Sequence, residues 1–305
     1  DLEKMVDTSD EWIFRRTGIK ERRIAPKEIG TSDMAYEAAK RALDNAGITA
    51  GDIDLILIAT STPDMFTPSV ACIVQSKLGI TNTPAIDLNS GCTGFVSALT
   101  VAQQFIATGC YKKILVIGAD NLSMMTDYKD RNTCILFGDG AGAVVLEGST
   151  DGCGIIDTYL GADGAGGMCL TSLAFKENDE EIAKRVSGLK QTLWMDGSEV
   201  LKFAVRIMAH STRTVLEKAN LTLDDIKLIV PHQANIRIVE GAIKRLELDE
   251  DKFIINLDKY GNMASASIPV ALGEAFDTGR IKAGDKVLLV GFGGGLTWGA
   301  AVIQL

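Results

Sequence analysis

The feature that most constrains the fold is an internal repeat at one fixed offset. Three separated segments match a second segment 173 positions later: 46–58 with 219–231, 98–99 with 271–272, and 113–118 with 286–291. Because separate matches rarely share one offset by chance, the chain predicts two homologous halves. A loop-like run from Glu147 to Gly154 places their boundary near residue 150, giving domains 1–150 and 151–305.

Each half alternates helical and strand patterns. A helix is expected from about Thr31 to Asn45, ended by Gly47, and an aliphatic strand follows over Leu55–Ile58. Strands that are apolar on both faces occur where helices cover both sides of a sheet. We therefore predict an α/β fold with two homologous halves stacked in layers around a pseudo-twofold axis.

The second half opens with a strand-like segment whose counterpart in the first half would precede the first residue given. Residues 154–160 carry this pattern, and subtracting the offset of the repeat places the equivalent residues before Asp1. The first strand of the first half is therefore expected to be absent from this sequence.

Composition excludes several classes of protein. Of 305 residues, 46% are hydrophobic and 23% charged, which is typical of a globular chain. A net charge of −9 disfavours nucleic-acid binding, and no apolar run approaches the length of a membrane span. The start, Asp1-Leu2-Glu3-Lys4, does not resemble a secretory signal, so a cytoplasmic location is expected. Two histidines and six scattered cysteines give no metal-site spacing, so no metal is expected and the thiols are interpreted as reduced.

Cys92 is the first candidate for chemistry. It lies between a strand-like segment, Ala85–Gly91, and a helical segment, Gly94–Ile106. Backbone N–H groups at a helix start stabilise a thiolate, so the pattern predicts a lowered pKa and a reactive nucleophile. The alternative is an inert buried thiol.

His232 and Asn262 are the candidates that would complete the site. His232 follows the strand-like Leu228–Pro231, at the end where α/β sheets bind ligands, although a structural turn would explain it too. Asn262 matches Asn89 across the repeat, which would bring its turn opposite the Cys92 turn. His210, within a helical stretch from about Val200 to Asn220, is interpreted as structural.

A glycine-rich segment near the C-terminus could supply backbone donors. Gly291–Gly299 follows a strand but lacks the pattern of a dinucleotide or phosphate loop. Its expected use is a backbone N–H that helps to form an oxyanion hole beside Cys92.

Taken together, the motifs resemble those of the β-ketoacyl-acyl-carrier-protein synthase III family, thiolase-fold condensing enzymes that start type II fatty acid synthesis. The resemblance covers essentially the whole chain. The motifs are Asp10-Glu-Trp-Ile, Arg16-Thr-Gly-Ile, Ser90-Gly-Cys-Thr-Gly94, Pro231-His-Gln-Ala-Asn235, Gly261-Asn262 and Gly293-Gly-Gly-Leu-Thr-Trp298.

This resemblance implies a decarboxylative Claisen condensation. Cys92 would take the acyl primer from an acyl-CoA as a thioester. His232 and Asn262 would bind malonyl-acyl-carrier protein and stabilise its enolate, while the N–H groups of Cys92 and Gly294 would form the oxyanion hole. No metal or redox cofactor is implied, and the family is usually homodimeric.

The resemblance also assigns binding residues. Trp12, Arg16 and Arg131 match positions that hold coenzyme A. A basic patch for the acidic carrier protein would comprise Lys202, Arg237, Lys244 and Arg245, although a bare charge cluster is more often a solvated face.

Two positions depart from the family pattern. Asn132 stands where the family often has Gly, which affects the coenzyme A site. Thr67 stands where many members carry a bulky aromatic residue at the primer pocket, so we predict a larger pocket and primers longer than acetyl.

Three alternative functions stay open from the sequence. One is a related thiolase-fold acyltransferase or condensing enzyme of secondary metabolism. The others are a non-catalytic acyl-CoA binding module and a Cys-His-Asn protease.

Overall fold

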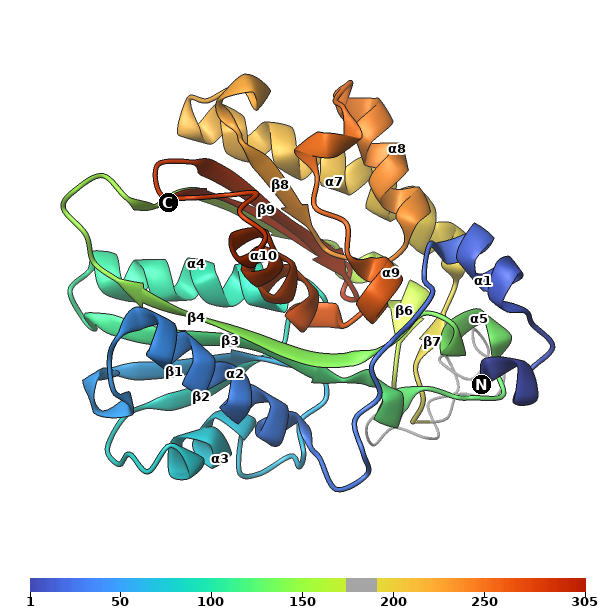
Figure 1. The fold of residues 1–305 in the computed structure, drawn as a ribbon, viewed down its shortest axis with the longest axis horizontal. Coiled ribbons are helices and arrows are strands. Elements are labelled where there is room, and N and C mark those ends of the chain that lie inside the picture. The colour runs from blue at the N-terminus through green and yellow to red at the C-terminus, as the bar shows by residue number, and fades with distance from the viewer. Residues whose placement is uncertain (174–190) are drawn as a thin grey trace.

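The computed structural model describes residues 1–173 and 191–305 and contains two four-stranded sheets, one in each half of the chain (Figure 1). The strand order is β2-β1-β3-β4 in the first sheet and β5-β10-β9-β8 in the second. A two-stranded sheet, β6-β7, lies apart from both.

The helices and strands of the first half are α1 (Asp10–Thr17), α2 (Thr31–Ala46), β1 (Leu55–Ala59), α3 (Val70–Lys77), β2 (Ala85–Leu88), α4 (Gly94–Ala107), β3 (Lys113–Asn121), α5 (Arg131–Cys134) and β4 (Asp139–Glu147). Those of the second half are β5 (Gly154–Ala162), β6 (Leu170–Thr171), β7 (Trp194–Met195), α7 (Gly197–Ala219), β8 (Leu228–Pro231), α8 (Ile236–Leu246), α9 (Leu257–Tyr260), α10 (Ser267–Asp277), β9 (Lys286–Gly293) and β10 (Thr297–Gln304). Short 3-10 helices are η1 (Leu2–Lys4), η2 (Ala50–Asp52), η3 (Leu122–Met125), η4 (Gly164–Cys169), η5 (Leu223–Asp225), η6 (Glu250–Lys252) and η7 (Ala264–Ala266).

The repeat seen in the sequence is also a repeat of structure. Helices α2 and α7 end 173 positions apart, and the same offset separates the first residues of β1 and β8, α4 and α10, and β3 and β9. In the first sheet β1 is parallel to β3, and β3 pairs antiparallel with β4. In the second sheet β8 is parallel to β9 in the same way, and β9 pairs antiparallel with β10. The prediction of two homologous α/β halves is confirmed. The boundary near residue 150 falls between β4 and β5 and stays a prediction.

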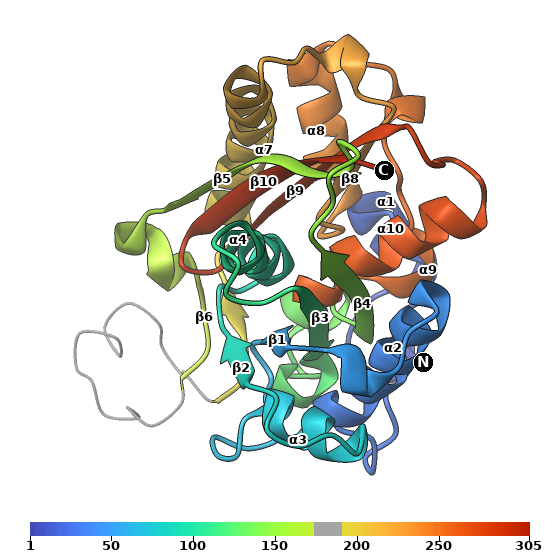
Figure 2. The ribbon, with the colours of Figure 1, turned by 90° about the vertical axis from the view of Figure 1, so that its left-hand side faces the viewer.

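The two sheets stack with helices between and outside them. Figure 2 shows α4 and α10 between the sheets, α2 and α3 below the first sheet, and α7 and α8 above the second. The central core joins residues of α4 and α10 to both sheets. Two outer cores pack α2 and α3, and α7 and α8, on the remaining sheet faces.

Strand β1 shows why its sequence is apolar throughout. Leu55 and Leu57 belong to the central core, whereas Ile56 and Ile58 belong to the outer core under α2 and α3. Because successive side chains point to opposite faces, a strand covered on both sides needs apolar residues at every position.

The first sheet ends at β4, whose partner among the described strands is β3. Its counterpart in the second sheet, β10, pairs with β9 on one side and β5 on the other. Within the described ranges, no helix is long and apolar enough to cross a membrane.

Candidate active site

Cys92 lies in a tight turn between β2 and α4, as the sequence predicts. The Oδ1 of Asn89 accepts a hydrogen bond from the Gly91 N–H at 3.2 Å, and Gly91 adopts a φ of 53°. The Gly94 N–H then donates to the Gly91 carbonyl at 2.9 Å, and α4 begins. A residue with a positive φ at position 91 reverses the chain within a few residues, so the thiol stands at the start of a buried helix.

The glycine-rich turn between β9 and β10 packs directly on this thiol. A Cβ added to Gly293 would lie 2.7 Å from the Cys92 Cβ, and one added to Gly91 would lie 2.8 Å from the Gly294 carbonyl oxygen. The Thr297 hydroxyl lies 3.0 Å from the carbonyl oxygens of both Ser90 and Gly294, so its single proton is shared between them and ties the two turns together. The backbones can approach this closely only because no side chain separates them.

The acidity of Cys92 differs from the prediction. Burial, assisted by the nearby carboxyl of Asp120, raises the pKa of the Cys92 thiol to about 12, while backbone N–H groups of Gly294 and of Cys92 itself act in the opposite direction. The prediction of a lowered pKa is wrong, because desolvation of the sulfur outweighs those donors. The resting group is a thiol.

Those two opposing donors are the ones expected to form the oxyanion hole. The backbone N–H groups of Cys92 and Gly294 both interact with the Cys92 sulfur. The glycine-rich turn thus places a backbone N–H beside Cys92, and its use in an oxyanion hole stays a prediction.

His232 follows β8 and is buried, with 1% of its surface exposed. Its backbone N–H donates to the Val290 carbonyl at 2.8 Å, its Nδ1 lies 2.6 Å from the Ser267 Oγ, and its ring packs on Phe292 with the centroids 5.1 Å apart. Burial lowers the pKa of His232 to about 3. The imidazole is therefore neutral at physiological pH and carries one ring proton.

Asn262 is held by its backbone on a segment of the first half. Its N–H donates to the Leu136 carbonyl and its carbonyl accepts from the Gly138 N–H, each at 2.9 Å. Its Oδ1 accepts a hydrogen bond from the Ala264 N–H at 2.9 Å, and the described residues offer its amide nitrogen no partner. The side chain is thereby oriented to present N–H donors.

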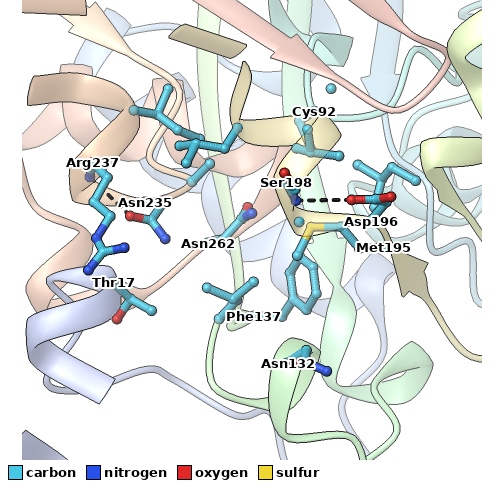
Figure 3. Close-up of a pocket in the computed structure, with 18 of the residues that line it drawn as sticks. Thr17, Cys92, Asn132, Phe137, Met195, Asp196, Ser198, Asn235, Arg237 and Asn262 are labelled. Atoms are coloured by element: carbon cyan, nitrogen blue, oxygen red, sulfur yellow. Dashed lines mark hydrogen bonds between the residues drawn. The ribbon is translucent and has the colours of Figure 1, made fainter. Parts of the chain in front are cut away.

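Cys92, His232 and Asn262 line one cavity of about 660 Å³. Figure 3 shows Cys92 and Asn262 on different elements beside the same space, with Met195 and Phe137 next to them. The apolar part of the lining includes Leu170, Met195, Leu201, Phe203 and Leu296. The structure thus brings together the three residues that the sequence analysis selected from distant segments.

The three residues expected to hold coenzyme A also lie together. Trp12 and Arg16 line the cavity, and the Arg16 and Arg131 guanidinium carbons lie 5.4 Å and 4.9 Å from the Trp12 ring centroid. Arg131 is not among the described lining residues, whereas its neighbour Asn132 is. In such an arrangement the indole can stack on a base, and the two guanidiniums can pair with phosphates.

The four predicted carrier-protein residues are all exposed, but they are not equivalent. Arg237, in α8, lines the cavity, and its guanidinium lies 3.5 Å from the Arg15 carbonyl oxygen (Figure 3). Lys244 and Arg245 lie in the last turn of α8 and are not among the described lining residues. Lys202, in α7, donates to Glu199 at 2.8 Å and is therefore partly neutralised.

Thr67 lies in the loop before α3 and is exposed. It is absent from the described lining of the cavity. A primer pocket shaped by Thr67 therefore stays a prediction.

Sequence reasoning missed Ser267, Phe292 and the lining residues Trp194 and Met195. Ser267 contacts His232 from 35 positions away, and nothing in the sequence marks that contact. Phe292 could have been noticed as a large aromatic side chain within a glycine-rich run. Trp194 and Met195 form the short strand β7, which carries no periodic pattern. All six cysteines lie in the described ranges and are free thiols, and no cluster of metal-ligating side chains occurs there.

A cysteine at the start of a central helix, with a histidine and an asparagine supplied by the other half of an internal repeat, defines a thiolase-fold condensing enzyme. Models of two family domains match the chain: "3-Oxoacyl-[acyl-carrier-protein (ACP)] synthase III" over residues 86–181 and its C-terminal domain over residues 216–305.

Relatives and solved structures agree over the full length. The chain is 54% identical to β-ketoacyl-[acyl-carrier-protein] synthase III of Caldanaerobacter subterraneus and 55% identical to that of Geobacillus kaustophilus, covering 100% of this chain and 92% and 93% of theirs. The crystal structure of 3-oxoacyl-[acyl-carrier-protein] synthase III from Aquifex aeolicus superposes with a TM-score of 0.93 at 45% identity, covering 100% of this chain and 94% of that one. The chain belongs to the β-ketoacyl-acyl-carrier-protein synthase III family of acyltransferases.

Proposed function

We propose that this chain starts type II fatty acid synthesis by condensing an acyl-CoA primer with malonyl-acyl-carrier protein. One observation carries the assignment of the site: Cys92, His232 and Asn262, from three distant segments, line a single cavity beside two backbone N–H donors. The other steps follow from what these groups can do.

In the first half-reaction the Cys92 sulfur attacks the acyl-CoA carbonyl. A new carbon-sulfur bond forms, the bond to coenzyme A breaks, and the thiol proton ends on the departing sulfur. The N–H groups of Cys92 and Gly294 stabilise the oxyanion of the tetrahedral intermediate. Because the resting group is a thiol, its proton must leave during the attack rather than before it.

In the second half-reaction malonyl-carrier protein loses CO₂. His232 and Asn262 donate hydrogen bonds to the thioester carbonyl, so the electrons of the broken carbon-carbon bond are held as an enolate. The enolate attacks the acyl group on Cys92, a carbon-carbon bond forms, and the cysteine leaves and regains a proton from solvent. A neutral imidazole suits this role because it donates a hydrogen bond without first having to lose or gain a proton.

The binding assignments follow the positions of the side chains. Trp12, Arg16 and Arg131 would hold the nucleotide of coenzyme A, and Arg237 is the patch residue best placed for the carrier protein because it lines the cavity. Lys202, Lys244 and Arg245 would add long-range attraction for an acidic partner. The proposed steps need no metal or redox cofactor, and we propose a cytoplasmic homodimer.

The test is a product assay with purified chain, a panel of acyl-CoAs and malonyl-carrier protein. Formation of β-ketoacyl-carrier protein with release of CO₂ would support the proposal, and transfer to a different acceptor would instead support a condensing enzyme of secondary metabolism. A stable acyl adduct without condensed product would indicate a binding module. Cleavage of a peptide panel in place of acyl transfer would indicate a protease. Turnover of primers longer than acetyl would measure the room left by Leu170, Leu201 and Phe203.

A further inference from the structure

The neutral state of His232 makes the position of its ring proton decisive. A neutral imidazole carries one N–H, so only one of its two nitrogens can donate. Nδ1 lies 2.6 Å from the Ser267 Oγ, whereas the described residues provide no hydrogen-bond partner for Nε2, although the residue lines the cavity. The group that controls Nδ1 therefore decides whether Nε2 meets a ligand as a donor or as an acceptor.

Ser267 is the first residue of α10 and is fully buried. Its hydroxyl has one proton and two possible acceptors, the His232 Nδ1 at 2.6 Å and the Ala264 carbonyl oxygen at 2.9 Å. That carbonyl already accepts the backbone N–H of Ser267. It is therefore satisfied without the hydroxyl proton, whereas an unprotonated Nδ1 would be a buried acceptor that lacked any other partner.

The surroundings of the Ser267 oxygen agree with this direction of donation. The Gln233 N–H points at the same oxygen from 3.4 Å and supplies a weak donor to one of its lone pairs. An oxygen that accepts from Gln233 and donates to His232 uses its hydrogen-bonding capacity in both senses. The shorter of the two contacts of the hydroxyl is the one to Nδ1.

We propose that Ser267 is a positioning residue. Its hydroxyl donates a hydrogen bond to Nδ1 of His232, which keeps Nδ1 unprotonated and places the ring proton on Nε2, facing the cavity. The effect on catalysis rests on the proposed function, because only an Nε2–H can stabilise the enolate oxygen. The opposite tautomer would direct a lone pair at that oxygen and repel it. The tautomer itself is a property of the free protein and can be measured without substrate.

The test is nitrogen NMR on the full chain labelled with ¹⁵N-histidine. The chain has two histidines, His210 and His232, so a His210→Gln variant assigns the signals. Wild-type protein is expected to show His232 with a protonated Nε2 and an unprotonated Nδ1. A proton on Nδ1 in the wild-type protein would overturn the proposal, whatever the variants do.

Variants separate the hydrogen bond from simple packing. Ser267→Ala should move ring proton toward Nδ1 and slow decarboxylation of malonyl-carrier protein roughly tenfold, the effect of losing one hydrogen bond in the transition state. Acylation of Cys92 should stay near the wild-type rate, because that step does not use His232 as a donor. Ser267→Thr, which keeps the hydroxyl, should restore the wild-type signals.

Ser265→Ala is the matched control, because Ser265 is also buried in this turn but bonds to Asp120 rather than to His232. Its His232 signals should match wild type, and an equal change in both variants would contradict the proposal. An Nε2–H with no condensation on malonyl-carrier protein would leave this inference standing while the proposed function failed. A proton on Nδ1 together with normal condensation would overturn this inference and leave the proposed function standing.

Discussion

Two turns of the molecule, 173 positions apart, share one backbone design and differ in what they can do. One places Cys92 before α4, and the other places Ser265 before α10. In both, an asparagine three residues earlier accepts a hydrogen bond from the N–H two residues after it, at 3.2 Å for Asn89 and 2.9 Å for Asn262. The residue that donates has a positive φ in each case.

The difference lies in the residue that faces each turn. Gly293 faces Cys92, and its equivalent in the first half is Asp120. The Asp120 carboxylate accepts hydrogen bonds from the Ser265 N–H at 2.9 Å and from the Ser265 hydroxyl, so this turn is closed by a side chain. Cys92 instead lines the cavity. We call the turn at Cys92 the open turn and the turn at Ser265 the closed turn. The same frame thus yields a reactive site where the facing residue is glycine and a structural one where it is aspartate.

Making the open turn like the closed one should have the largest effect. In a Gly293→Asp variant the new Cβ would start 2.7 Å from the Cys92 Cβ. We expect acylation of Cys92 by acyl-CoA, followed by intact mass, to fall at least about a hundredfold because the reacting atoms are displaced. Gly291→Ala is the control, since its Cβ would meet nothing closer than 3.4 Å and Gly291 has no assigned role in the reaction. Equal losses in both variants would argue against the steric explanation.

The closed turn should be sensitive to loss of its carboxylate. Asp120 also accepts from the Ser61 N–H at 2.7 Å and the Thr62 hydroxyl at 3.2 Å, so an amide nitrogen in its place would face donors. Asp120→Asn should lower the free energy of unfolding by about 2 kcal/mol in a urea titration. Asp54→Asn, an exposed carboxylate that accepts two backbone N–H groups, should cost less. A smaller loss at position 120 would contradict this reading.

The two halves also differ at the ends of β1 and β8, where Ala59 in the first half is the repeat equivalent of His232 in the second. The pKa of His232 is lowered to about 3, so between that value and about 6.5 the unfolded chain binds a proton that the folded chain does not. Stability from this group is present above pH 6.5 and lost as pH falls, by about 1.4 kcal/mol per unit.

Wild type should therefore lose about 2 kcal/mol more than His232→Gln between pH 7 and pH 5, measured as free energies of unfolding in urea. Parallel curves for the two proteins would show that His232 is not desolvated as the structure indicates.

The thiol in the open turn should react as a buried one. With the pKa of Cys92 raised to about 12, its thiolate fraction should rise about tenfold for each pH unit between about 7 and 9. Alkylation of the Cys92 peptide by iodoacetamide, followed by mass spectrometry, should follow that slope. An alkylation rate that levels off below about pH 8 would show that the pKa of Cys92 is lowered, as the position at the helix start predicts.

The smallest effect is expected from adding a thiol to the closed turn. In a Cys92→Ala background, Ser265→Cys should gain no acyl adduct from acyl-CoA, because the Asp120 side chain covers that position. The same protein unfolded in denaturant and alkylated shows that the new thiol is present. An acyl group at position 265 in the folded protein would show that the facing residue does not decide reactivity.

The sequence could predict the frame because the frame rests on local patterns and on the repeat. Alternation of helix and strand, the glycine-marked turn before Cys92 and the match of Asn262 with Asn89 all lie within short segments. It could not predict the acidity of Cys92, because that depends on burial of the sulfur, and the turn at Gly293 that packs against Cys92 lies about 200 positions away. The same limit hid the contact between Ser267 and His232, because it depends on how distant segments pack.

The central claim is that Cys92 alone carries the acyl group and passes it on. Peptide mapping after incubation with an acyl-CoA tests it most directly, followed by addition of malonyl-carrier protein. The account predicts one acyl group, on the Cys92 peptide and absent in Cys92→Ala, which disappears as β-ketoacyl-carrier protein forms. An acyl group on any other residue, or one on Cys92 that malonyl-carrier protein leaves in place, would contradict it.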